Sequence, residues 1–123
     1  MRLPSAVEPA LSPRAPMVLT GLLLALCAST TATAADLTAG QKVYMANCMA
    51  CHGISADGKG PAAASLQPPP ADFTSPSFWA SRDAAKVKSV IKTGKPGTTM
   101  MPFTQLSEQD LENLVAFLES KKP

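Results

Sequence analysis

The sequence has little histidine, cysteine or net charge, and these shortages exclude several classes of function. Its 123 residues include one histidine and three cysteines. Eleven lysines and arginines stand against nine aspartates and glutamates, which leaves a formal net charge of +2. Proteins that bind nucleic acid use many basic groups to neutralise phosphates, so we expect no nucleic-acid partner. No internal repeat and no long β-type alternation is visible, which disfavours a solenoid or a sheet.

The sequence also lacks an apolar run long enough for a membrane-spanning helix. Met17 to Ala28 is apolar over about a dozen residues, whereas a spanning helix needs roughly 20. Basic residues precede this run, and small residues, including Ala32-Thr33-Ala34, follow it. This order is typical of a secretory leader that ends at a signal-peptidase site. We expect residues 1–35 to be a removed signal peptide, with no stable membrane anchor, and residues 36–123 to form one periplasmic domain.

A short motif carries most of the chemistry. Cys48-Met49-Ala50-Cys51-His52 has the spacing by which a c-type haem is attached. Each thiol can form a thioether with one vinyl group of the haem, and the imidazole that follows can bind the iron. We therefore predict one covalent haem c, held by Cys48 and Cys51, with His52 as the proximal iron ligand. Cys27, the third cysteine, falls within the predicted leader.

Other uses of the same motif fit less well. A structural zinc site takes four Cys or His ligands, whereas residues 36–123 offer three, crowded into five positions. A thioredoxin-like redox pair lies beside a βαβ unit, and no strand is predicted. Because His52 is the only histidine, bis-histidine ligation is excluded within one chain. The sixth iron ligand is then a methionine, an amine, water or nothing.

Methionine supplies the sixth ligand in the interpretation that we favour. Two of the six methionines lie in the predicted leader, and Met45 and Met49 lie in or just before the attachment motif, close to the proximal histidine. Met100 and Met101 follow about 50 residues later, in a loop rich in glycine and proline. Pro102 restricts the preceding residue to extended backbone, so we expect Met101 rather than Met100 to bind the iron.

Three stretches have the pattern of helices, and they run over about Thr38–Cys48, Ser81–Thr93 and Ser107–Leu118. Asp36 or Thr38 is the expected cap of the first and Ser81 that of the second, which stops at Gly94. Ser107 and Asp110 resemble a capping box at the start of the third. The connections between these stretches are rich in glycine and proline.

Taken in order, the motifs resemble those of a small bacterial class I c-type cytochrome with one haem and His/Met ligation. The resemblance covers residues 36–123 and rests on Cys48-Met49-Ala50-Cys51-His52-Gly53, Gly58-Lys59-Gly60-Pro61, Ile91-Lys92-Thr93-Gly94 and Met101-Pro102-Phe103. It implies an all-α fold, a compact bundle of about three main helices with Gly/Pro-rich loops around one covalent haem.

The resemblance also implies roles for single residues. The carbonyl of Pro61 would accept a hydrogen bond from the second ring nitrogen of His52, which fixes the ring. Gly40 and Tyr44 resemble the pair at which the first and last helices cross, with Phe117 as their partner. Trp79 would either bind a haem propionate or pack in the core. The remaining pocket walls would be Leu66, Phe73 and Phe78.

The implied function is one-electron transport between a redox-protein donor and acceptor in the periplasm, by a monomer without catalytic activity of its own. Two alternatives stay open: a ligand-binding or catalytic haem protein with a labile methionine, and a small haem subunit of an oxidase or dehydrogenase complex. Six lysines either ring the haem edge and steer an acidic partner or are scattered over the surface; they are Lys42, Lys59, Lys86, Lys88, Lys92 and Lys95.

Overall fold

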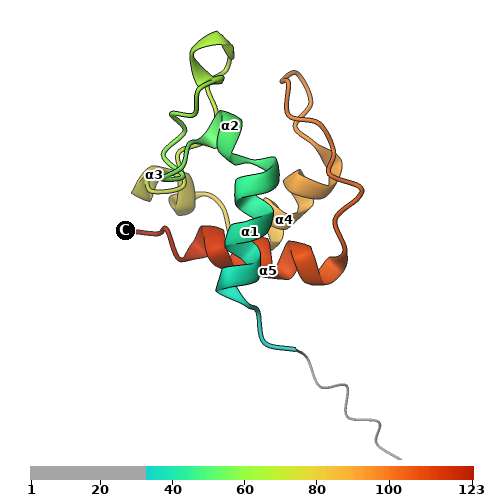
Figure 1. Cartoon of the computed structure of the whole chain (residues 1–123). Coiled ribbons are helices and arrows are strands. Elements are labelled where there is room, and N and C mark those ends of the chain that lie inside the picture. The colour runs from blue at the N-terminus through green and yellow to red at the C-terminus, as the bar shows by residue number, and fades with distance from the viewer. Residues whose placement is uncertain (1–32) are drawn as a thin grey trace, which may run out of the picture. The chain divides into compact units, whose positions relative to one another are not determined.

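Helices form all the regular structure in the described part of the chain (Figure 1), which is residues 33–123 of a computed structural model. The elements follow in the order α1 (Leu37–Asn47), α2 (Met49–His52), the 3₁₀ turn η1 (Ala63–Ser65), α3 (Pro76–Ala80), α4 (Ala84–Thr93) and α5 (Glu108–Glu119). None of the helices in this part is long and apolar enough to cross a membrane. The predicted all-α class is confirmed. The signal peptide predicted for residues 1–35 lies almost wholly outside the described residues.

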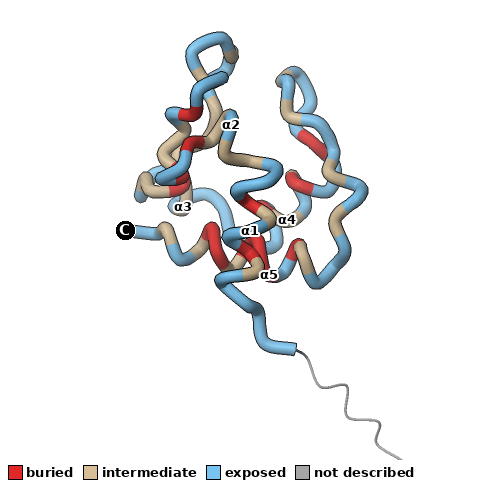
Figure 2. The backbone as a smooth tube through the Cα atoms, viewed as in Figure 1, coloured by how far each residue is buried: buried red, intermediate tan, exposed pale blue. Residues whose placement is uncertain are grey.

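The crossing of α1 and α5 organises the core. Gly40 lies against the backbone of α5 so closely that a Cβ at this position would be 2.0 Å from the carbonyl oxygen of Asn113. One turn further along α1, the ring of Tyr44 packs against that of Phe117 with centroids 5.3 Å apart. The buried residues gather where α1, α4 and α5 meet (Figure 2). The crossing expected for Gly40, Tyr44 and Phe117 is therefore present.

Local side-chain caps explain where the helices begin. The Asp36 carboxylate accepts hydrogen bonds from the backbone N–H groups of Thr38 and Ala39, so Asp36 caps α1. Ser107 and Asp110 form the predicted capping box of α5.

The cap predicted for the second helix was wrong. Ser81 ends a short unpredicted helix, α3, which has a proline in its first turn. The next helix, α4, starts three residues later than expected, because the Asp83 carboxylate accepts the backbone N–H of Lys86. Gly94 ends α4 as predicted, with a positive φ of 74°.

Two loops extend from the same end of this helical core and stand on either side of α2 in the view of Figure 1. One follows α2 and runs from residue 53 to the start of α3, with η1 at its far end. The other joins α4 to α5 and carries Met100 and Met101. The helical core therefore presents two long loops at the end where the Cys48–His52 motif lies.

Candidate functional site

A cavity of about 650 Å³ brings the predicted site residues together. Its lining includes Cys48, Cys51 and His52 from the attachment motif and both Met100 and Met101 from the loop after α4. The volume lies within the range of roughly 300–1,000 Å³ that is usual for pockets that hold small molecules and cofactors. Two segments about 50 residues apart in sequence thus line one cavity, as the predicted ligand set requires.

The attachment motif is held by backbone contacts on both sides. It forms the short helix α2, in which the N–H of His52 donates to the carbonyl of Cys48 at 2.9 Å. The Tyr44 hydroxyl donates a buried hydrogen bond of 2.6 Å to the carbonyl of Gly53, just after the motif. Gly60 lies against the other side, where a Cβ would be 2.4 Å from the carbonyl oxygen of Ala50. The motif is therefore fixed by the core and by the returning chain.

The imidazole of His52 is held by the segment before α3. Its Nδ1 lies 3.1 Å from the carbonyl oxygen of Ala71, and its ring packs 4.9 Å from that of Phe73. Burial lowers the pKa of His52; the hydrogen bond to Ala71 opposes this shift, and nearby Lys95 adds to it. The ring is therefore favoured in its neutral form, which is the form that binds metals. With the proton on Nδ1, the lone pair of Nε2 is available to an iron.

The acceptor found for Nδ1 differs from the one that the resemblance implied. Pro61 is exposed and is not among the residues that line the cavity, whereas Ala71 lines it. Every residue offers a backbone carbonyl, so the sequence carried no signal for Ala71. A hydrogen bond between His52 and Pro61 stays a prediction, for the haem-bound protein.

The two cysteines of the attachment motif both line the cavity. Cys48 and Cys51 are both partly buried and free of a disulfide. Burial raises the pKa of the Cys48 thiol to about 11, with a smaller contribution from neighbouring Cys51. Cys48 is thus a neutral thiol near pH 7 and is less prone to thiolate chemistry such as oxidation.

The two loop methionines differ sharply in their surroundings. Met100 is partly buried and packs against the hydrophobic core, whereas Met101 is 73% exposed. Of the methionines in residues 33–123, these two line the cavity, and Met45 and Met49 do not. A thioether that lines a cavity and makes little core contact can bind a ligand there without loss of packing. This difference supports Met101 over Met100 as the candidate.

The rest of the cavity wall is mainly apolar, and it includes Leu66, Phe73, Phe78, Val87, Val90, Ile91 and Phe103. The three wall residues that were predicted are among them. Trp79 donates its indole N–H to the carbonyl of Phe73 at 2.8 Å and so holds this wall. Of the two roles considered for Trp79, the structure therefore shows packing beside the core. Such a lining suits a flat, largely apolar cofactor.

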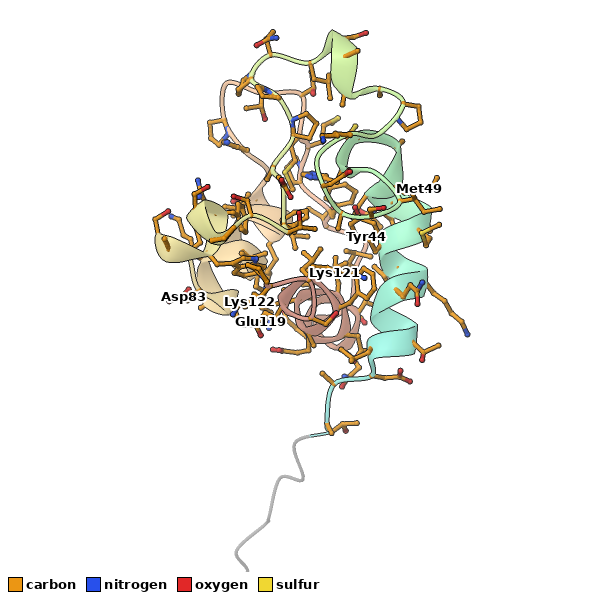
Figure 3. The ribbon with its side chains drawn as sticks, turned by 90° about the vertical axis from the view of Figure 1, so that its left-hand side faces the viewer. Tyr44, Met49, Asp83, Glu119, Lys121 and Lys122 are labelled. Carbon is orange, nitrogen blue, oxygen red and sulfur yellow. The ribbon has the colours of Figure 1, made fainter. Side chains whose placement is uncertain are left out.

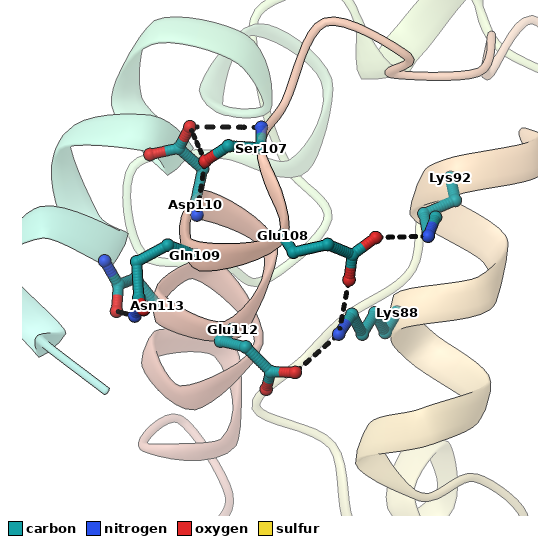
Figure 4. A network of polar contacts seen from close by, with 8 residues as sticks. All are labelled: Lys88, Lys92, Ser107, Glu108, Gln109, Asp110, Glu112 and Asn113. Carbon is teal, nitrogen blue, oxygen red and sulfur yellow. Dashed lines mark hydrogen bonds and ion pairs between the residues drawn. The ribbon is translucent and has the colours of Figure 1, made fainter. Parts of the chain in front are cut away.

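The charged residues of the lining are all basic, namely Arg82, Lys86 and Lys95. This separates four of the six lysines considered above, of which Lys86 and Lys95 line the cavity. Lys88 and Lys92 instead form ion pairs with Glu108 on α5, and Lys88 also pairs with Glu112 (Figure 4). Arg82 was not predicted, and its position depends on α3, which the sequence did not indicate. Basic charge at the cavity therefore comes from α4, its C-terminal end and the segment just before it.

The donor set as a whole fits a covalent haem: two thiols, one neutral imidazole and a thioether around an apolar cavity. Within residues 33–123, no three His, Cys, Asp or Glu side chains are grouped so that they could hold a metal ion by themselves.

Comparisons with known proteins agree with this geometry. The family described as Cytochrome c matches residues 37–122. Cytochrome c-554(547) of Halothiobacillus neapolitanus is 37% identical over 92 residues, which is 72% of this chain and 100% of that protein. A solved chain of the reducing HAO-like protein complex of Kuenenia stuttgartiensis is similar with a TM-score of 0.59 and 27% identity. That match covers 68% of this chain, which spans only 41% of the other chain's length.

Proposed function

Because this chain belongs to the cytochrome c family, we propose that residues 36–123 carry single electrons between two redox proteins of the periplasm. The observation that supports the proposal most directly is the joint lining of one cavity by Cys48, Cys51, His52 and Met101. A haem bound there supplies the one-electron change between ferric and ferrous iron. The Cys-x-x-Cys-His motif within a cytochrome c domain implies that this haem is covalent.

The chain's own groups have defined tasks in this proposal. Cys48 and Cys51 would anchor the cofactor, and the neutral imidazole of His52 and the thioether of Met101 would be the two protein ligands of its iron. With both of these protein ligands in place, a small molecule could bind the iron only by displacing one of them. Thioether ligation and an apolar lining both favour the ferrous state and raise the potential. These properties suit an electron carrier and disfavour catalysis at the iron.

The identity of the sixth ligand is tested by a pair of substitutions. We expect Met101→Ala to open the iron, so that the ferrous protein binds carbon monoxide rapidly and its potential falls. Because Met101 is 73% exposed, this change should cost little packing, and any loss of stability should come from the lost bond to the iron. Met100→Ala should leave the iron closed to carbon monoxide. Because Met100 is partly buried, we expect this change to lower the free energy of unfolding by about 2 kcal/mol or less.

Carbon monoxide binding and redox titration measure the two ligand effects, and denaturant unfolding measures stability. If the unmodified protein binds carbon monoxide rapidly and Met101→Ala changes nothing, Met101 is not the ligand. The carrier proposal would then give way to a ligand-binding or catalytic haem protein.

Export and assembly are tested by one preparation. We expect the periplasmic fraction to contain a protein with the mass of residues 36–123 plus one haem, and acid-acetone extraction to leave the colour on the protein. Gel filtration of the same fraction separates a free monomer from a subunit of a larger complex.

The second candidate function, a haem subunit, is supported by the similarity to a chain of the HAO-like protein complex. Elution with a larger redox enzyme would favour that candidate, and extractable haem or an uncleaved membrane form would contradict the proposal.

A further inference from the structure

Gly94 occupies the point where the methionine loop returns to the end of α4. It is buried, and its φ of 74° lies in the left-handed region, so it ends α4 and turns the chain outward. A Cβ at this position would be 2.9 Å from the carbonyl oxygen of Met100, 2.9 Å from the nitrogen of Pro102 and 3.0 Å from the carbonyl carbon of Met101. All three are backbone atoms, which cannot move aside as the end of a flexible side chain can.

The loop is tied down on both sides of this contact. The N–H of Lys95 donates to the carbonyl of Met100 at 3.0 Å, and the N–H of Phe103 donates to the carbonyl of Ile91 at 3.0 Å. Within the loop, the Thr98 hydroxyl accepts the N–H of Met100 at 3.1 Å and donates to the carbonyl of Lys95 at 2.7 Å. These bonds bring residues 100–102 back against α4, and the absence of a side chain at residue 94 permits the approach.

From this geometry we infer that Gly94 is a positioning residue for the iron ligand Met101, because only glycine lets the Met100–Pro102 backbone pack on the end of α4. The inference rests on the proposed function, in which Met101 binds the iron. A methyl group at residue 94 must push that backbone away from α4, and Met101 moves with it. Gly94 touches no cofactor in this account and acts only through the loop.

The chain contains a control glycine three residues away. Gly97 also has a positive φ, of 77°, and it lies in the same loop. A Cβ at Gly97 would meet no atom within 4 Å. Gly94→Ala and Gly97→Ala therefore both place an alanine at a positive φ, which costs backbone strain. Only Gly94→Ala adds a close contact with Met100–Pro102, and its ψ of 179° adds strain of its own.

The experiment compares both variants with the wild-type holoprotein. We expect ferrous Gly94→Ala to bind carbon monoxide at least about tenfold faster than the wild type, which corresponds to about 1.4 kcal/mol in activation free energy. Its reduction potential should also be lower. Gly97→Ala should match the wild type in both measurements. Unchanged carbon monoxide binding by Gly94→Ala would overturn the inference whatever its loss of stability, since that loss would then reflect backbone strain alone.

Two further outcomes are distinguishable. If Gly94→Ala gives no folded holoprotein, Thr98→Val decides, because it frees the N–H of Met100 without adding an atom at residue 94. Faster carbon monoxide binding by Thr98→Val would support the loop as the positioning device, and unchanged binding would contradict it. If the wild type itself binds carbon monoxide rapidly, the proposed function fails, and Gly94 then has no ligand to position.

Discussion

The two ends of this domain are held together differently. At the α1–α5 crossing, side chains interlock: Tyr44, Leu111, Leu114 and Leu118 are nearly or fully buried, and a glycine lets the two helices touch. At the other end, glycines again let two stretches of backbone come close together, as at Gly60 and Gly94. The side chains there line a cavity instead of filling the space. The crossing is thus a packed core, while the loops shape a binding site.

Tyr44 connects the two ends. Its ring packs in the crossing, and its hydroxyl donates to the carbonyl of Gly53 beside the attachment motif. Burial of the hydroxyl raises the pKa of Tyr44 well above its ordinary value, so the group remains a donor at all physiological pH values. Figure 3 shows Tyr44 on α1 close to α5, near the base of the loops. The position of His52 therefore depends on a core residue as well as on its own loop.

The largest effect on the crossing is expected from Gly40→Ala. The added Cβ would be 2.0 Å from the carbonyl oxygen of Asn113, so the two helices must separate. We expect a loss of about 3 kcal/mol or more, at the upper end of what overpacking costs. This exceeds the gain of roughly 0.5–1 kcal/mol that alanine brings to a helix interior.

Denaturant unfolding measures this loss, with Gln41→Ala at the exposed neighbouring position as the control, expected within about 0.5 kcal/mol of the wild type. A Gly40→Ala protein as stable as the wild type would show that the crossing is not close-packed. The contrast between the two ends of the domain would then disappear.

The smallest effect is expected from the ion pairs that join α4 to α5 at the base of the methionine loop. Lys88 pairs with Glu108 at 2.9 Å and with Glu112 at 2.5 Å, and Lys92 also pairs with Glu108. The hydrogen bonds from Lys92 and Lys88 lower the pKa of Glu108 from its ordinary value of 4.5 to about 2. Because these groups are exposed and salt screens them, we expect Glu108→Gln to destabilise less than Gly40→Ala does.

The pH dependence of this small effect follows from the lowered pKa. The stabilisation is fully present above pH 4.5, where Glu108 is ionised in both the folded and the unfolded chain, and it is lost as the pH falls towards 2. The difference in unfolding free energy between wild type and Glu108→Gln should shrink over that interval, and added salt should reduce it at neutral pH. Glu119→Gln is the control, because its pair with Lys122 stays within one helical turn. A difference that does not vary with pH would contradict this origin.

Sequence patterns predicted the features that depend on a few neighbouring residues. The Cys48–His52 motif, the capping box of Ser107 and Asp110, and the stop at Gly94 all involve residues within about one turn of each other. The start of the second helix was predicted wrongly because two possible capping residues, Ser81 and Asp83, lie within three residues of each other. The outcome depends on α3, whose five residues carry too little periodicity to be recognised.

By itself, the sequence determined the chemical groups of the site: two thiols, one imidazole, and a methionine before a proline. It also determined the helices that are long enough to be recognised from their sequence pattern. Tertiary structure decided which groups meet across long separations. Ala71 reaches His52 from 19 residues away, Lys88 and Lys92 pair with α5 while Lys86 and Lys95 line the cavity, and Gly94 lies under Met100–Pro102. A backbone carbonyl has no sequence signal of its own, and a glycine does not show which distant backbone will pack against it. Its role appears only when the path of the chain brings a partner to it.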